Sequence, residues 1–209
     1  MDAFYCDVKA MYSESSISYF AARLPKYLIN DSKSYVHIRD RINFLTGRLM
    51  LKELLIEFDL PMSLNEIQTT IYGKPYFENG KHFSISHTNG MVGLALDDQD
   101  VGVDCEKMRQ INVDQYRELF TDKEWAAIIN AADTLDCFFD IWTKKESIAK
   151  ADGRGFNIEM NSINIQDEDV YISGKPTSWK VNSRNINEVY KLSTCGNKLA
   201  SNRLREFLL

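Results

Sequence analysis

The order of helical and extended patterns is the feature that most limits what this chain can fold into. A long helical pattern over Ser34–Phe58 precedes a set of short β-like runs, and the helical patterns Asp122–Ala132 and Leu135–Ala151 precede a second set. Each half therefore begins as helix and continues as a sheet meander. We predict an α+β fold of two similar halves, residues 1–100 and residues 101–209. The runs that we expect to form strands are Phe4–Val8, Ile67–Tyr72, Phe83–Ser86, Met91–Leu96, Val101–Cys105, Ser162–Ile165, Val170–Ile172, Trp179–Val181 and Val189–Leu192.

The charge balance and the cysteines exclude several classes of protein. The formal net charge is -5, so the chain lacks the basic footprint of a general nucleic-acid binder. The 4 cysteines are widely spaced without a CxxC pair, which argues against a zinc site and against a disulfide framework. No apolar stretch approaches membrane-spanning length, and the first residues lack a signal-peptide pattern. We therefore expect a soluble cytoplasmic protein that binds neither nucleic acid nor membrane.

Two charged residues interrupt the apolar face of the helical pattern Leu135–Ala151. At about 100° per residue, Lys145 and Glu146 fall among the aromatic and aliphatic positions of that face. Charged side chains are seldom buried unless they pair or bind a ligand. One interpretation is that Lys145 and Glu146 pair with each other at the edge of the core. Because Lys150 adds a third charge one turn further on, we favour the alternative, a polar pocket beside this helix.

A second anomaly lies in the run Val101–Glu106. Alternate side chains of a strand share a face, so Asp104 and Glu106 project together, on the side of Gly102. Two carboxylates at that spacing repel each other unless a cation lies between them. Oxygen ligands of this kind suit Mg²⁺, which takes few protein ligands. The alternative is an exposed strand end that enters a turn, and the Asp-x-Glu pattern taken alone favours that alternative.

These motifs occur in a characteristic order: GKPYF, FSISHT, GVDCE, FTDKEW and WTKKESIAKADGRG. In that order, over Gly73–Gly155, the chain resembles the 4′-phosphopantetheinyl transferases, specifically the single-chain surfactin-type group. The resemblance implies an α+β fold whose two similar halves are related by a pseudo-twofold and hold coenzyme A between them. It also implies Mg²⁺-dependent transfer of the phosphopantetheine arm of coenzyme A to a serine of an apo acyl or peptidyl carrier protein, with release of 3′,5′-ADP.

The resemblance further implies a role for individual residues. The residues that it places at the metal are Asp104, Glu106 and Glu146. Those that it places around coenzyme A are Lys74, Pro75, Ser86, His87, Arg41, Arg48, Lys145 and Lys150. Within this set His87 contacts the 3′-phosphate, helped by Arg41 or Arg48, and Lys150 also belongs to the catalytic set. The serine proton passes to Glu124 or, alternatively, to Glu146.

Two other functions use the same carboxylates. A Mg²⁺-dependent phosphohydrolase or kinase is one, but the chain has no GxxxxGK[ST] loop and no kinase motif set. A non-catalytic module that binds coenzyme A or a carrier is the other, and the intact GVDCE and WTKKE motifs argue against it. We therefore predict a transferase, and the resemblance to the single-chain group implies that it acts as a monomer. The carrier, from fatty-acid, polyketide or peptide synthesis, is left open.

Overall fold

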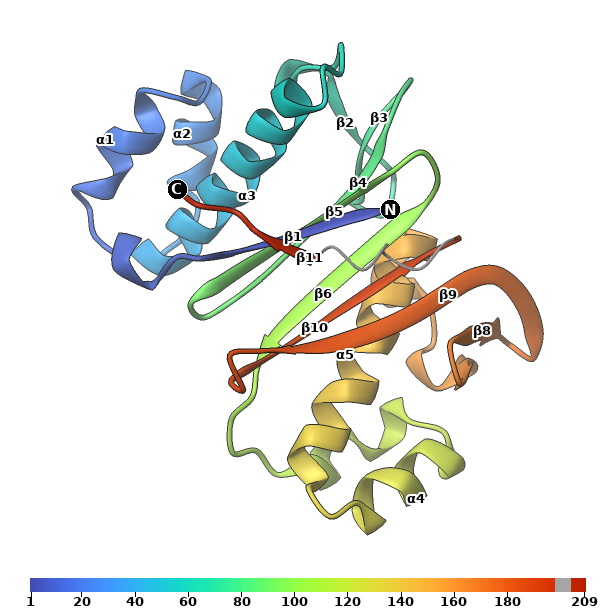
Figure 1. Cartoon of the computed structure of the whole chain (residues 1–209). Coiled ribbons are helices and arrows are strands. Elements are labelled where there is room, and N and C mark those ends of the chain that lie inside the picture. Colours follow the sequence, from blue (N-terminus) through green and yellow to red (C-terminus); the bar gives the residue numbers. More distant parts are fainter. Residues whose placement is uncertain (198–203) are drawn as a thin grey trace.

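The computed structural model describes residues 1–197 and 204–209, which form an α+β fold (Figure 1). The α-helices are α1 (Ser16–Ala21), α2 (Lys26–Ser32), α3 (Ile38–Glu57), α4 (Asp122–Asn130) and α5 (Thr134–Asp152). Short 3-10 helices cover Lys9–Met11, Leu64–Glu66, Val113–Leu119, Gly155–Asn157 and Met160–Ser162. The strands are β1 (Asp2–Asp7), β2 (Ile67–Thr69), β3 (Pro75–Phe77), β4 (His82–Thr88), β5 (Met91–Asp97), β6 (Val101–Lys107), β7 (Ile163–Gln166), β8 (Asp169–Ile172), β9 (Lys175–Ile186), β10 (Tyr190–Gly196) and β11 (Leu204–Glu206).

Most strands belong to two larger sheets. The first has the order β11-β1-β5-β4, and the second has the order β6-β10-β9-β8-β7. Neighbouring strands are antiparallel except β1 and β11, which are parallel. Because β11 pairs with β1, the chain returns to the first sheet at its C-terminal end. The proposed division into halves at residue 100 stays a prediction.

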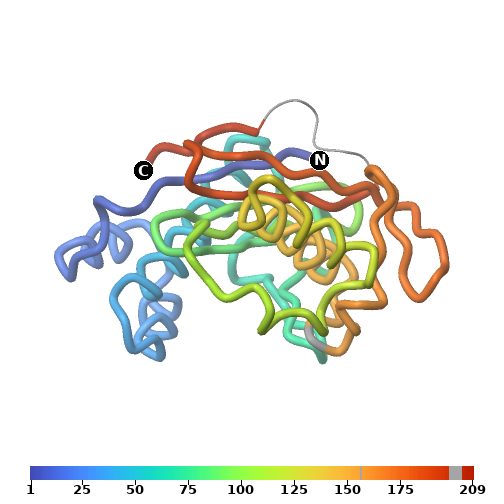
Figure 2. Tube along the Cα trace, turned by 90° about the horizontal axis from the view of Figure 1, so that it is seen from below, coloured from blue at the N-terminus to red at the C-terminus, as the bar shows by residue number. Residues whose placement is uncertain are grey.

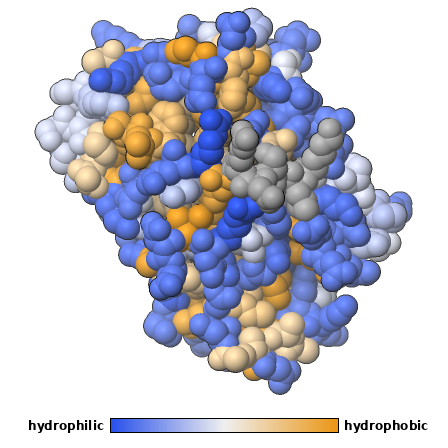
Figure 3. Space-filling view, viewed as in Figure 1, coloured by the Kyte–Doolittle hydropathy of each residue, from blue (hydrophilic) through white to orange (hydrophobic). Residues whose placement is uncertain are grey.

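A long helix packs against each sheet. Helix α3 packs on β4 and β5, and α5 packs on β6, β9 and β10. Figure 2 shows the strands along one side of the molecule, with α4 and α5 on the side below them. On the face in Figure 3 the surface is largely hydrophilic, and apolar residues gather over the α1–α3 end. None of the described helices is long and apolar enough to cross a membrane.

Local sequence signals explain where α4 and α5 begin and end. Thr121 accepts a hydrogen bond from the Glu124 backbone N–H while Glu124 accepts one from the Thr121 N–H, which is a capping box at the start of α4. Asp133 caps α5 by accepting from the Asp136 N–H. Helix α5 ends at Gly153, whose φ of 84° favours glycine.

The expected pattern of elements is largely confirmed. The three long helical patterns form α3, α4 and α5, and every expected strand is present. Several boundaries differ: α3 begins at Ile38 rather than Ser34, β2 ends at Thr69, where a turn follows, and β4, β9 and β10 run further than expected. The short helices α1 and α2 were not predicted, because they have about two turns or fewer in which to display a periodicity. The three-residue strands β3 and β11 were not predicted either.

Candidate active site

The active-site candidate forms where α5 lies directly on β6. A Cβ atom added to Gly102 would lie 1.8 Å from the Ser147 carbonyl oxygen and 2.6 Å from the Ala151 amide nitrogen. Only glycine permits this approach of helix to strand. Asp104 and Glu106 follow Gly102 on the same face of β6, so the helix residues Glu146 and Lys150 come close to them.

Gly102→Ala is therefore expected to damage both the fold and the site. The methyl group would collide with the backbone of α5, which cannot rotate away, so we expect a loss of about 1–3 kcal/mol or more of unfolding free energy. Urea unfolding measures the change. Gly93→Ala is the matched control, because its Cβ would meet only side chains, at 3.3 Å or more. Equal stability of the Gly102 variant and wild type would contradict the close contact.

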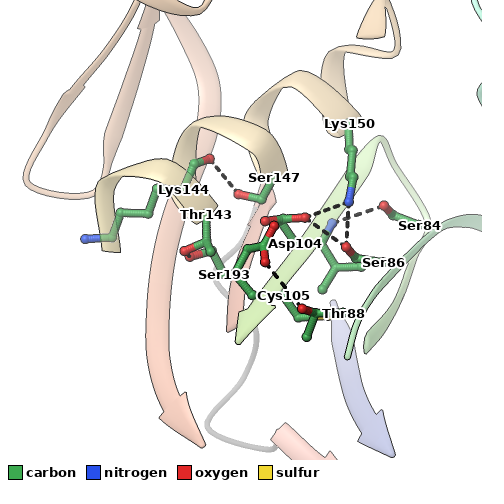
Figure 4. A network of polar contacts seen from close by, with 12 residues as sticks. Ser84, Ser86, Thr88, Asp104, Cys105, Thr143, Lys144, Ser147, Lys150 and Ser193 are labelled. Atoms are coloured by element: carbon green, nitrogen blue, oxygen red, sulfur yellow. Dashed lines mark hydrogen bonds and ion pairs between the residues drawn. The ribbon is translucent and has the colours of Figure 1, made fainter. Parts of the chain in front are cut away.

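Asp104 is the centre of the polar cluster at this contact. Its side chain is 7% exposed, and its Oδ1 accepts hydrogen bonds from Ser86 Oγ at 2.8 Å and from Lys150 Nζ at 2.7 Å. Lys150 Nζ also donates to Ser86 Oγ at 2.7 Å. Figure 4 shows Lys150 reaching from α5 toward both residues. The other carboxylate oxygen, Asp104 Oδ2, is buried and has no hydrogen-bond partner among the described residues.

Glu106 and Glu146 bring two further carboxylates to the cluster. Glu106 Oε2 accepts from Thr88 Oγ1 at 3.3 Å and from Arg109 Nη1 at 3.4 Å. Burial and the negative charge of Asp104 raise the pKa of Glu106. The carboxylate of Glu146 has no hydrogen bond or ion pair with the described residues. Burial, followed by the charges of Asp104 and Glu106 and opposed by that of Lys150, raises the pKa of Glu146 to about 7.

This donor set has the chemistry of a site for a hard divalent cation. It offers only oxygen ligands, it leaves one buried oxygen of Asp104 unpartnered, and its carboxylates repel one another. Among the described residues, no three His, Cys, Asp or Glu side chains lie close enough together to hold a metal ion by themselves. The fit to Mg²⁺ therefore rests on two or three carboxylates together with oxygens from outside the protein.

Lys145 pairs with Glu124, so the less favoured interpretation, in which it pairs with Glu146, is wrong. Its fully buried Nζ lies 2.7 Å from Glu124 Oε2 and donates to the Ile163 carbonyl at 2.8 Å. Burial lowers the pKa of Lys145, and Glu124 opposes that shift. The helical periodicity located Lys145 on the apolar face correctly, but its partner comes from α4 rather than from the next residue. The pair holds α4 to α5, and the expected roles of both residues toward substrate stay predictions.

His87, at the end of β4, lines a cavity of about 450 Å³. Desolvation and the positive charge of Lys150 lower the pKa of His87. The other residues around this His87 cavity are Arg39, Asp40, Asn43, Thr88, Asn89, Glu106, Lys107 and Arg109. None of its three cations was among the predicted site residues: Arg39 lies in the first turn of α3, and Lys107 and Arg109 lie at or just past the end of β6.

A smaller cavity of about 220 Å³, which we call the Lys74 cavity, lies between the turn at Gly73–Pro75 and the end of α5. Lys74, Pro75 and Lys150 line it, and Lys150 also contacts Asp104, so it adjoins the Asp104 cluster. Lys74 Nζ donates to the Ala151 carbonyl at 2.7 Å, which ties the turn to the last turn of α5. Lys150 therefore lies near four residues predicted to bind coenzyme A. It bonds to Ser86, its charge acts on His87, and it lines the same cavity as Lys74 and Pro75.

The structure does not bring Arg41 and Arg48 to this cluster. Arg41 Nη1 pairs with Glu14 Oε1 at 3.1 Å. Arg48 lines another cavity, and none of the described residues around that cavity belongs to the Asp104 cluster or to the His87 cavity. The arginine of α3 that does line the His87 cavity is Arg39.

A hydrogen-bond network beside the turn that follows His87 was not predicted from the sequence either. Tyr12 Oη donates to Asn43 Oδ1 at 2.9 Å and accepts from the Gly90 N–H at 2.7 Å, and Asn43 Nδ2 donates to the Thr88 carbonyl at 3.3 Å. These bonds fix the turn that follows His87. No sequence signal joins residues so far apart in the chain.

Comparison with known proteins identifies a family. Residues 100–195 match the 4′-phosphopantetheinyl transferase superfamily. The chain is 30% identical over 168 residues to the 4′-phosphopantetheinyl transferase gsp of Aneurinibacillus migulanus, covering 77% of this chain and 71% of that protein. It is 26% identical over 174 residues to the 4′-phosphopantetheinyl transferase Sfp of Bacillus subtilis, covering 78% and 77%. The crystal structure of Thermotoga maritima holo-[acyl-carrier-protein] synthase matches 46% of this chain and 61% of that one, with 14% identity and a TM-score of 0.36.

The first of these relatives is similar over most of both chains, and the superfamily match covers the strand of Asp104 and Glu106 as well as the whole of α5. The expected resemblance is thereby confirmed, and the chain belongs to the 4′-phosphopantetheinyl transferase superfamily.

Proposed function

We propose that this protein transfers the 4′-phosphopantetheine arm of coenzyme A to a serine hydroxyl of an apo acyl or peptidyl carrier protein. The observation that carries the proposal is the Asp104 cluster, in which a buried carboxylate with one unpartnered oxygen lies beside Lys150 and two further carboxylates. Membership of the superfamily supports the same reaction. Such a cluster suits a pyrophosphate that is bound together with a divalent cation.

In this reaction the serine oxygen attacks the β-phosphorus of coenzyme A and 3′,5′-ADP leaves. Mg²⁺, held by Asp104, Glu106 and Glu146, would neutralise charge on the pyrophosphate. Lys150 lies between the cluster and the Lys74 cavity and offers a positive charge to the same phosphates. Lys74 and Pro75 line the nucleotide side of the site. Phosphoryl transfer depends mainly on such positioning and charge neutralisation.

The serine proton needs an acceptor, and Glu146 suits that role better than Glu124. Glu146 lies beside Asp104 and Lys150, and no described side chain occupies its carboxylate oxygens, so they are free to accept a proton. One oxygen of Glu124 is already occupied by Lys145 and by the cap of α4. Glu124 stays the alternative acceptor.

Transfer of mass to a carrier tests the proposal most directly. Purified protein, coenzyme A, Mg²⁺ and an apo-carrier should yield a carrier whose intact mass has increased by the phosphopantetheine group. A phosphohydrolase would release phosphate without modifying the carrier, and a non-catalytic module would do neither. The protein is further proposed to act as a cytoplasmic monomer, and a panel of apo-carriers compared by rate would identify the pathway.

The His87 cavity is proposed to hold the 3′-phosphate, with Arg39, Lys107 and Arg109 supplying further positive charge. His87→Ala should therefore weaken binding of coenzyme A by about 1.5–3 kcal/mol, the size of a charge-assisted hydrogen bond. Binding of 3′-dephospho-coenzyme A should change little, because that ligand lacks the phosphate. Calorimetric titration of both ligands measures the difference. Equal losses for the two ligands would place His87 elsewhere.

A further inference from the structure

Arg48 is a cation that lacks a counter-ion in the described part of the chain. Its Nη1 atom is buried without a hydrogen-bond partner, and no described carboxylate forms an ion pair with it. Burial lowers the pKa of Arg48. A guanidinium presents five donors and is costly to bury without acceptors. One guanidinium nitrogen of Arg48 therefore lacks an acceptor, and an anion from outside the protein would supply one.

Arg48 lines a cavity of about 520 Å³ together with three aromatic residues, Tyr27, Tyr35 and Phe44, and with aliphatic and polar ones. The Phe44 ring lies under the guanidinium, with 5.3 Å from Arg48 Cζ to the ring centroid. Tyr35 continues this wall, since its ring centroid lies 5.5 Å from that of Phe44. Tyr27 lines the cavity from α2, and its hydroxyl donates to the Leu64 carbonyl at 2.9 Å. We call this space the Arg48 cavity.

The charge of Asp31 limits which anion the Arg48 cavity can accept. Asp31 also lines it and interacts electrostatically with Arg48, although the two form no ion pair. A ligand with several negative charges, such as a phosphate or a pyrophosphate, would be repelled by Asp31. A single carboxylate can face the guanidinium in a bidentate manner while an apolar body covers the aromatic rings.

We propose that the Arg48 cavity binds a small organic carboxylate, with Arg48 holding the carboxylate and Tyr27, Tyr35 and Phe44 packing against its aromatic or apolar body. Among the described residues, this cavity shares no lining residue with the His87 cavity or the Lys74 cavity. It is therefore a second ligand site, separate from the proposed coenzyme site, and the inference does not depend on the proposed function.

Benzoate and its neutral analogue benzamide test the charge requirement. Titration of the full chain should show saturable binding of benzoate and at least about tenfold weaker binding of benzamide, because a charge-assisted bond is lost. A saturating concentration of coenzyme A should not displace benzoate. Absence of saturable benzoate binding, equal affinity for benzamide, or displacement of benzoate by coenzyme A would each overturn the proposal.

Three variants test the residues. Arg48→Met should weaken benzoate binding by about tenfold or more, and its ligand-free melting temperature should be equal to or above that of wild type, because an unpartnered buried charge is removed. Arg39→Met, which removes the same charge from the same helix in the other cavity, should bind benzoate like wild type. A benzoate affinity in Arg48→Met equal to that of wild type, or in Arg39→Met as weak as in Arg48→Met, would overturn the assignment.

Asp31→Asn keeps the test decisive if Arg48→Met fails to fold. Asp31 is exposed, so the substitution should leave the fold intact and tighten benzoate binding about two- to fivefold by removing a repulsive charge. An unchanged or weaker affinity in this variant would show that benzoate does not bind beside Asp31, and the proposal would fail.

Discussion

Asp104→Asn is expected to lower the rate of transfer by at least about a hundredfold, the usual cost of removing one preorganised charge from a transition state. The amide keeps the shape of the side chain but loses the negative charge that Lys150 contacts at 2.7 Å and that a bound cation would require. Formation of modified carrier, measured by mass spectrometry under saturating coenzyme A, gives the rate. Circular dichroism of each preparation gives the folded fraction by which that rate is divided.

A control variant separates this effect from a general loss of charge. Asp169→Asn removes a carboxylate that pairs with Lys180 on the surface of the second sheet, outside the cluster. Exposed ion pairs contribute about 0–1 kcal/mol, so the fold and the rate of this variant should be those of wild type. A folded Asp104→Asn protein that transfers as fast as Asp169→Asn would refute the role of the cluster in the reaction.

The sequence predicted the parts of the site that depend on periodicity within one element. Strand alternation placed Asp104 and Glu106 on one face, and helical periodicity placed Lys145 on the buried side of α5. Both inferences need only the geometry of a single strand or helix. For the same reason the long helices and most strands were predicted close to their observed bounds.

The partners of these residues depend on how helices and strands pack against one another. The periodicity within one element carries no information about that packing. Lys145 finds Glu124 because the cap of α4 lies over α5, and this contact spans 21 residues of sequence. Arg48 was assigned to coenzyme A by resemblance, but on α3 it faces α2 rather than β4. Strand alternation placed Gly102 on the face of Asp104 and Glu106, but only the structure identifies α5 as the element that packs against it.

Glu146→Gln is expected to abolish most transfer while leaving the ligand-free fold as stable as wild type, or more stable. The folded-state pKa of Glu146, about 7, lies above the ordinary value of 4.5, so the folded protein holds this proton more tightly than the unfolded chain. The favourable contribution of Glu146 to the free energy of unfolding is therefore complete below pH 4.5 and is lost as the pH rises through 7. Glutamine does not titrate, so stability should depend less on pH across this window. Above pH 7 the free energy of unfolding of the variant should exceed that of wild type by at most about 3 kcal/mol.

Glu124→Gln is the matched comparison, because it makes the same chemical change on the neighbouring helix with the opposite expected result. It removes the only ion-pair partner that Lys145 has among the described residues, and breaking a buried pair costs about 3–5 kcal/mol. Urea unfolding from pH 5 to pH 8, together with transfer rates per folded molecule, distinguishes the two glutamates. If Glu146 accepts the serine proton and binds the cation, turnover collapses in Glu146→Gln and survives in folded Glu124→Gln. The reverse outcome, with Glu146→Gln melting early yet transferring normally, would make Glu124 the proton acceptor and leave Glu146 a structural residue.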